Sequence, residues 1–190
     1  MKNETLSELL KTQTLAPHQQ LEKGLVQRMR AMRSADDYIG LLQLFYSYFG
    51  ALEDRINLYI DSTNLPDHLE RRKSACLADD IRALGGILPE KVGVEDIPEI
   101  ENHLQAFGAL YVMEGSTLGG QIISQMIGKQ LGMQDKGLSF FKSYGDNLTT
   151  MWDTFKLALN KQAKNDAEAE SIIATAAETF RKFKVLLDRS

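Results

Sequence analysis

Apolar residues recur three and four positions apart along most of this chain, and only four of its 190 residues are proline. This spacing lines apolar side chains along one face of an α-helix, whereas a half-buried strand alternates them at every second position. No segment shows convincing strand alternation. We therefore expect an all-α fold, and the length together with an ordinary globular composition predicts one domain, 1–190.

Six segments carry the helical pattern and are expected to form the main helices: 15–32, 35–60, 66–84, 98–131, 146–161 and 167–187. Ser34 with Asp37 three residues later is a typical helix start, and Gly85-Gly86 is a typical helix stop. The proline at 66 and the proline at 98 are expected to open their helices. The segment 35–60 has the widest apolar face, which suits a central position in the core.

Charge and composition exclude several classes of function. The net charge of −4 argues against a nucleic-acid partner, which needs a basic surface. The single cysteine, Cys76, excludes an internal disulfide and fits a reducing compartment. The segment Met1–Thr14 has no apolar signal core, and no run of about 18 apolar residues could cross a membrane. We expect a cytoplasmic protein without a membrane partner.

Glycines interrupt the helical pattern at 108, 115, 119 and 120. A glycine inside a helix costs about 1 kcal/mol relative to alanine, so the last three together cost roughly 3 kcal/mol. The spacing places Gly108, Gly115 and Gly119 near one helix face. Two explanations remain open: close packing against another helix, or a flat ligand lying directly on the backbone.

His18 lies one turn before Glu22 on the same helical face, beside Leu21. Such a histidine is usually a core or boundary residue. It is also suited to metal binding, since the carboxylate one turn away can accept a hydrogen bond from the second ring nitrogen and fix the tautomer. Pro17 is compatible with a helix start if Thr14 is the N-cap.

The other two histidines are expected to serve no site. His68 lies in a charged, polar stretch and is expected at the surface, and His103 is expected to be structural. Neither belongs to a Glu-x-x-His pair, and a carboxylate-bridged di-iron bundle needs two such pairs.

Two segments together resemble the biliverdin-producing heme oxygenases. LKTQTLAPHQQLE at 10–22 is similar to the proximal helix of that family, and YVMEGSTLGGQ at 111–121 is similar to its distal helix. The run FFKSYG at 140–145, followed by Trp152 and Phe155, resembles the bacterial branch, including members that accompany bacteriophytochromes. The resemblance spans nearly the whole chain.

The resemblance implies a fold of eight or nine helices with heme b between the first long helix and a kinked glycine-rich helix. By position, His18 would bind the iron and Glu22 would orient it. Gly115, Ser116 and Gly119 would lie over the reactive distal face, with Gly120 beside the heme. Heme would be both cofactor and substrate. With O2 and electrons from a ferredoxin or flavin reductase, it would be opened to biliverdin, carbon monoxide and ferrous iron, and a bacteriophytochrome could use the biliverdin.

The resemblance also implies cationic or hydroxyl anchors for the heme propionates, for which the candidates are Lys11, Lys142, Tyr144 and Lys156. Animal members carry an aspartate where this chain has Ser116, and a serine cannot ionise near neutral pH. A proton relay would therefore run through water held by backbone carbonyls, Ser116 or Thr117.

Three alternatives remain on sequence grounds. The first is a protein of the same fold that stores, senses or delivers heme without degrading it. The second is a thiaminase-like relative that uses a cysteine nucleophile, but Cys76 lies among small apolar residues that favour burial over reactivity. The third is a protein-interaction bundle, which would leave the His18–Glu22 pair without a role.

Overall fold

The fold is all-α, as the sequence predicts. The structure is a computed structural model that describes residues 4–190, so the first three residues of the segment Met1–Thr14 lie outside it. The described residues contain no strand. Their α-helices are α1 (Leu6–Gln13), α2 (Leu15–Ala31), α3 (Ala35–Ile56), α4 (Ala75–Ala83), α5 (His103–Gly115), α6 (Gly120–Leu131), α7 (Ser139–Lys142), α8 (Leu148–Leu159) and α9 (Asp166–Arg189). Short 3₁₀ helices are η1 (His68–Glu70), η2 (Val94–Asp96), η3 (Ser116–Gly119) and η4 (Gly145–Asn147).

Local signals explain where several helices begin. The Ser34 hydroxyl accepts a hydrogen bond from the Asp37 N–H, and the Asp37 carboxylate accepts one from the Ser34 N–H, which confirms the predicted start of α3. Thr14 precedes α2 as expected, but its hydroxyl donates to the Leu10 carbonyl oxygen instead of capping α2. The junction of α1 and α2 is therefore a tight turn within one nearly continuous helical segment.

Two expected helices differ from the structure. The segment 66–84 contains η1, then an extended stretch around Arg71, and only then α4, because Arg71 and Arg72 turn inward to bind other elements. The helix expected from Pro98 begins at α5, where the Asn102 side chain accepts from the Gln105 N–H as N-cap. The short helices α1 and α7 were not expected from periodicity.

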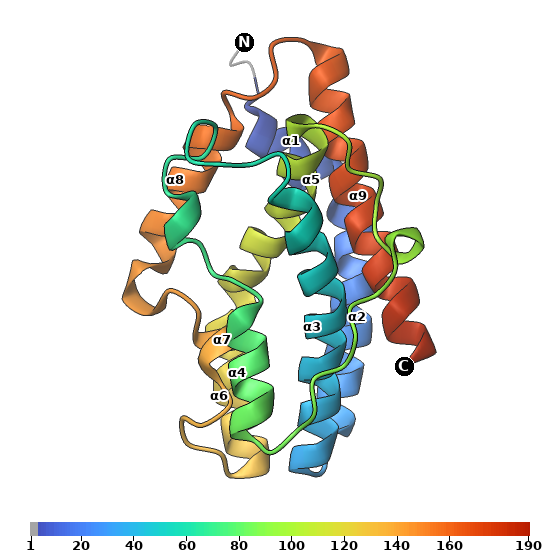
Figure 1. Ribbon diagram of the computed structural model, residues 1–190, viewed down its shortest axis with the longest axis vertical. Coiled ribbons are helices and arrows are strands. Elements are labelled where there is room, and N and C mark those ends of the chain that lie inside the picture. The colour runs from blue at the N-terminus through green and yellow to red at the C-terminus, as the bar shows by residue number, and fades with distance from the viewer. Residues whose placement is uncertain (1–3) are drawn as a thin grey trace.

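Helix α9 is the shared support of the bundle. It packs along both α2 and α5 and also contacts α3, whereas α4, α6 and α7 gather at the other side of the elongated molecule (Figure 1). Among residues 4–190, no helix combines the length and apolar character needed to cross a bilayer.

The core is built around α3, whose predicted apolar face is buried. Phe45 contacts Phe183 of α9 and the two aromatic residues of α7, with ring centroids 5.0–5.7 Å apart. The Tyr48 ring stacks on Phe183 at 4.7 Å, and its hydroxyl donates to the Thr179 carbonyl oxygen at 2.7 Å. Buried tyrosines are stable here because their hydroxyls are hydrogen-bonded.

A strained turn follows α7. Ser143 has φ 47° and ψ −121°, and Tyr144 has φ −78° and ψ −2°, which are the angles of a type II′ turn. The first of these positions strongly favours glycine, because a Cβ is crowded there. The Ser143 hydroxyl is also buried without a hydrogen-bond partner among the described residues. Both features cost stability, and the turn carries Tyr144 into the interior.

We expect Ser143→Gly to raise the free energy of unfolding by about 1–2 kcal/mol, since it relieves the left-handed backbone and removes the unpaired hydroxyl. Ser143→Ala should raise the free energy of unfolding by less, because it removes the hydroxyl but keeps the Cβ. Urea denaturation of the three proteins measures both effects. A loss of stability in Ser143→Gly would show that the serine side chain contributes more than the strain costs.

Candidate functional site

One wall of the candidate site is α2. His18 lies near its start, and the imidazole is exposed on one side while its ring centroid lies 5.3 Å from that of Phe180 in α9. Glu22 is also exposed, one turn further along. In the described residues no hydrogen bond joins these two side chains, so the orienting role of Glu22 stays a prediction. The His18 ring nitrogens are available for a ligand.

The opposite wall is the segment α5–η3–α6, called the distal helix below. It continues from His103 to the predicted end at Leu131, but changes from α to 3₁₀ geometry at Ser116 and returns to α geometry at Gly120. A 3₁₀ stretch inside a helix changes its direction and marks strain or function. The kink expected from the glycines is therefore present.

Two bridges join the residues at the ends of α2 to the distal helix. At one end the Tyr111 side chain of α5 lies close to the Thr14 side chain, which precedes α2, and burial raises the pKa of Tyr111. At the other end the Gln130 side-chain amide donates to the carbonyl oxygens of Met29 and Met32, at 3.2 and 2.6 Å. Between the bridges no hydrogen bond, ion pair or ring contact joins the two walls within residues 4–190.

The four glycines divide into two functional groups. A Cβ on Gly108 would overlap the Ile172 carbonyl oxygen of α9, and one on Gly120 would overlap the Phe141 carbonyl oxygen of α7. A Cβ on Gly115 would have its nearest neighbour at 3.8 Å, in Trp152, and one on Gly119 at 4.0 Å, in Ile123. Gly115 and Gly119 are therefore open, whereas Gly108 and Gly120 permit close packing.

This division corrects two expectations. Gly108 shares a helix face with Gly115, but α9 lies against α5 at Gly108, so the same face is covered there. Gly120, expected beside a ligand, is buried against α7. Close packing therefore explains Gly108 and Gly120, whereas for Gly115 and Gly119 a ligand on the backbone stays a prediction.

A buried ionic network lies behind the distal helix. The Arg71 guanidinium binds Glu114 at 2.9 Å and Asp67 at 2.5 Å, and both Arg71 and Glu114 are nearly fully buried. Burial opposes the charge on Arg71, but the hydrogen bonds that Arg71 donates to Asp67 and the charge of Glu114 outweigh it, so the Arg71 pKa is raised. The Tyr144 hydroxyl donates to the Glu114 carboxylate at 3.0 Å and accepts from the Arg72 N–H at 2.8 Å.

The candidate anchors for a ligand carboxylate lie in different surroundings. Tyr144 points into the buried network, where burial and the Glu114 charge raise its pKa, and Lys142 pairs with Asp135. Lys156 pairs with Asp153 at 2.9 Å, but its ammonium also lies 6.0 Å from the Trp152 ring centroid, beside Gly115. Lys11 is exposed at the end of α1. Lys11 adjoins α2 along the chain, and Lys156 lies beside Trp152, the residue nearest to Gly115.

Sequence reasoning missed several residues that shape the site, namely Tyr111, Trp152, Glu114 and Arg72. Glu114 had a usable signal, because it is a lone charge in an otherwise apolar helix. Trp152 and Tyr111 were visible only as parts of a family pattern. Arg72 had no usable signal in the sequence, since a run of charged residues usually indicates a solvated surface.

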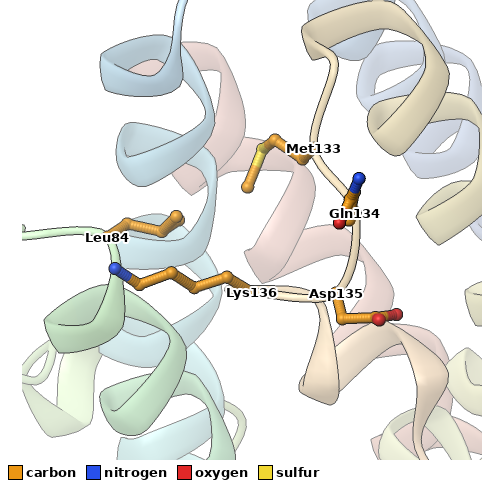
Figure 2. A pocket seen from close by; sticks show the side chains of 5 residues that line it. All are labelled: Leu84, Met133, Gln134, Asp135 and Lys136. Carbon is orange, nitrogen blue, oxygen red and sulfur yellow. The ribbon is translucent and has the colours of Figure 1, made fainter.

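Hollows elsewhere do not suggest another site. A hollow of about 410 Å³ lies between the end of α4 and the loop 133–136, lined by Leu84, Met133, Gln134, Asp135 and Lys136 (Figure 2). The Asp135 carboxylate points away from Leu84 and Met133, and it pairs with Lys142 outside this lining. Within the described range, no cluster of three His, Cys, Asp or Glu side chains could hold a metal ion.

Comparison with known proteins identifies the fold and the family. The heme oxygenase family model matches residues 4–189. A heme oxygenase of Xanthomonas campestris pv. campestris is 26% identical over 153 residues, which cover 80% of this chain and 90% of the relative. The chain belongs to the heme oxygenase family.

Solved heme oxygenase structures share the fold. The heme oxygenase from Leptospira interrogans superimposes with a TM-score of 0.79 at 18% identity, over 98% of this chain and 100% of the other. The NO- and CO-bound heme oxygenase from Neisseria meningitidis gives a TM-score of 0.79 at 24% identity, over 98% of this chain and 92% of the other. The all-α heme oxygenase fold and the resemblance found in the sequence are confirmed.

The residues present fit the heme that this family takes. The two walls offer an exposed imidazole on one side and open glycine backbone on the other. Large apolar side chains on the same elements are exposed, at 47% for Leu15, 46% for Leu118 and 73% for Ile122. A flat apolar ligand between the walls would cover such side chains.

Adjacent glycines allow a matched test of the two glycine groups in the heme-free enzyme. We expect Gly119→Ala to leave the free energy of unfolding unchanged or raise it by up to about 1 kcal/mol, because its Cβ meets open space. Gly120→Ala should cost about 2 kcal/mol or more, because its Cβ overlaps a backbone carbonyl. Urea denaturation measures both. Equal losses in the two variants would mean that Gly119 also serves packing.

Proposed function

We propose that this heme oxygenase opens heme b to biliverdin, carbon monoxide and ferrous iron, with His18 as the iron ligand and the distal helix over the opposite face. The observation that carries the proposal is the pair of walls, with the exposed His18 imidazole on one and the open backbone of Gly115 and Gly119 on the other. When bound, heme supplies the iron that activates O2 and is also the ring that is opened.

His18 would hold the iron through one ring nitrogen as a neutral imidazole. The other nitrogen then carries the proton, and Glu22, one turn away, is the acceptor proposed for it. This hydrogen bond would form on heme binding by rotation of the two exposed side chains. A neutral histidine also donates less electron density to iron than a thiolate would, which suits attack on the ring rather than early cleavage of the O–O bond.

Gly115 and Gly119 would let the distal backbone approach the heme closely. A side chain at either position would occupy the space in which O2 must lie, so their absence positions the oxygen against the ring edge. Leu118 and Ile122 would exclude bulk water from the same face. These are positioning and shielding roles that need no ionisable group.

Lys11 and Lys156 are the anchors we propose for the heme propionates, since both lie near the walls and each carries a mobile positive charge. Lys156 would exchange its exposed pair with Asp153, which contributes little stability at a surface. Lys142 also has an exposed pair, with Asp135, and remains a further candidate anchor, whereas Ser116, Gly120 and Tyr144 contact Arg72, α7 and Glu114 and are left out of the proposed ligand contacts.

Electrons would come from an outside ferredoxin or flavin reductase in the cytoplasm, and a bacteriophytochrome is a proposed user of the biliverdin. These partners rest on the resemblance of the sequence to the bacterial branch of the family.

The central test adds hemin to the purified protein and then ascorbate or a ferredoxin system. We expect a Soret band of histidine-ligated heme, followed by its loss as biliverdin absorption appears. His18→Ala should lose the histidine-ligated spectrum and turnover, whereas His103→Ala, which changes an exposed histidine at the start of α5, should keep both. A stable heme complex that yields no biliverdin would favour heme storage, sensing or delivery. Normal turnover by His18→Ala would contradict the ligand assignment.

Glu22→Gln tests the orienting role. We expect heme binding to persist with a lowered iron–histidine stretching frequency, because an amide oxygen polarises the imidazole less than a carboxylate does. Activity should fall by about tenfold. Glu70→Gln, which changes an exposed acid on η1, is the control. A stretching frequency identical in wild type and Glu22→Gln would show that Glu22 does not contact His18.

A further inference from the structure

The change of helix geometry at Ser116 leaves one carbonyl without its usual backbone donor. The Ser116 N–H bonds to the Val112 carbonyl oxygen at α spacing, and the Gly120 N–H bonds to that of Thr117 at 3₁₀ spacing. When the spacing drops from four residues to three after Ser116, the Met113 carbonyl is the one that is skipped. An unpaired buried carbonyl costs about 1–3 kcal/mol, so the break needs another donor.

Side chains supply that donor. The Ser116 hydroxyl donates to the Met113 carbonyl oxygen at 2.6 Å, and the Arg72 guanidinium donates to the same oxygen at 2.9 Å. Arg72 also donates to the Ser116 hydroxyl oxygen at 2.7 Å. The Thr117 hydroxyl donates to the Glu114 carbonyl oxygen at 2.6 Å in the next turn. Arg72 is the only one of these donors that comes from outside the distal helix.

Arg72 is itself held firmly. Its guanidinium lies 4.0 Å from the centroid of the Phe140 ring and donates to the Phe140 carbonyl oxygen at 3.3 Å. Its backbone N–H donates to the Tyr144 hydroxyl, which is fixed by Glu114. A charged donor gives stronger hydrogen bonds than a neutral one, and an anchored donor loses little entropy in making them.

Glycine permits a break in a helix but does not fix its geometry. Gly115 and Gly119 lower the helix propensity on both sides of the break, yet they offer no side-chain donor to the skipped carbonyl. Without an outside donor, the segment 115–120 could exchange between α and 3₁₀ hydrogen bonding at small cost.

We propose that Arg72 is a positioning residue that fixes the break in the distal helix by bonding to Met113 and Ser116, and so sets how the backbone of Gly115 and Gly119 lies over the heme. The effect on the heme rests on the proposed function, whereas the role of Arg72 in the helix break does not. Ser116, in this account, serves as an intermediate contact between Arg72 and the helix.

The first experiment uses the heme-free protein. In Arg72→Met we expect amide hydrogen exchange at residues 117–120 to be about tenfold faster, as the loss of two hydrogen bonds implies, with exchange in α3 and α9 unchanged. Arg55→Met is the matched control, since Arg55 is also half-buried, donates to the Ile100 carbonyl oxygen at 2.8 Å and lies 5.6 Å from the Tyr59 ring centroid. It should leave residues 117–120 unchanged. Ser116→Ala should give a smaller increase at the same amides, and it replaces Arg72→Met if that variant does not fold.

The second experiment uses the heme complex. Arg72→Met should bind hemin through His18 but alter the ferric electron paramagnetic resonance spectrum and yield more than one biliverdin isomer, because the distal backbone is no longer fixed. Arg72→Lys, which keeps a charged donor, should restore much of the wild-type spectrum and isomer pattern.

The outcomes separate the two proposals. If no variant or wild type binds hemin, the proposed function fails, while faster exchange in Arg72→Met alone still supports the role of Arg72 in the break. If hemin binds and biliverdin forms but exchange, spectrum and isomers are the same in wild type and Arg72→Met, the positioning role is wrong. Equal changes in Arg72→Met and Arg55→Met would show a general loss of stability and would also overturn it.

Discussion

The close packing of α9 against both α2 and α5 is the constraint on which the site depends. At Gly108 the α5 backbone lies directly against the Ile172 carbonyl of α9, with no room for a Cβ, and Gly24 of α2 has a similarly close neighbour in Leu187 of α9. Because both walls pack on the same helix, their relative position depends on these two glycine contacts. The contacts at Tyr111 and Gln130 add to this at the two ends, so the arrangement of the walls is set by helices and not by flexible loops.

The ionic network behind the distal helix has a different role. A buried pair such as Arg71–Glu114 adds little net stability compared with apolar residues, but breaking it costs about 3–5 kcal/mol because one charge is left buried and unpaired. It therefore specifies a geometry more than it strengthens the fold. Glu114 is the residue before Gly115, so the network fixes the last turn of α5 just ahead of the break. Tyr144, which the strained Ser143 turn directs inward, completes the network from the opposite side.

The sequence predicts the helices that bury a wide apolar face, and it singles out His18, Glu22 and the distal glycines as candidates, because periodicity and rare residues are local signals. It mispredicts the stretch around Arg71 and Arg72, because a run of charges on a helix and a run of charges that turns inward have the same composition. It also does not show that Gly108 and Gly120 pack against neighbouring helices. Helical spacing shows which residues share a face, but only the path of a second helix shows what covers that face, and the distances to α9 and α7 are tertiary facts. The buried partners of Tyr144 and Ser116 were hidden for the same reason.

Adjacent glycines in the distal helix thus serve opposite needs. Gly120 lets the α7 backbone approach one side of the helix, which brings Phe140 and the following turn close enough for Arg72 and Tyr144 to meet Met113, Ser116 and Glu114. Gly119 leaves the other side bare. The contacts of α7 and Arg72 hold one side of the helix in place, and the open side at Gly119 depends on them, because a helix of low propensity without such contacts would change its geometry. The roughly 3 kcal/mol that three glycines cost the helix is therefore offset by the contacts with α7, while the backbone at Gly119 stays open.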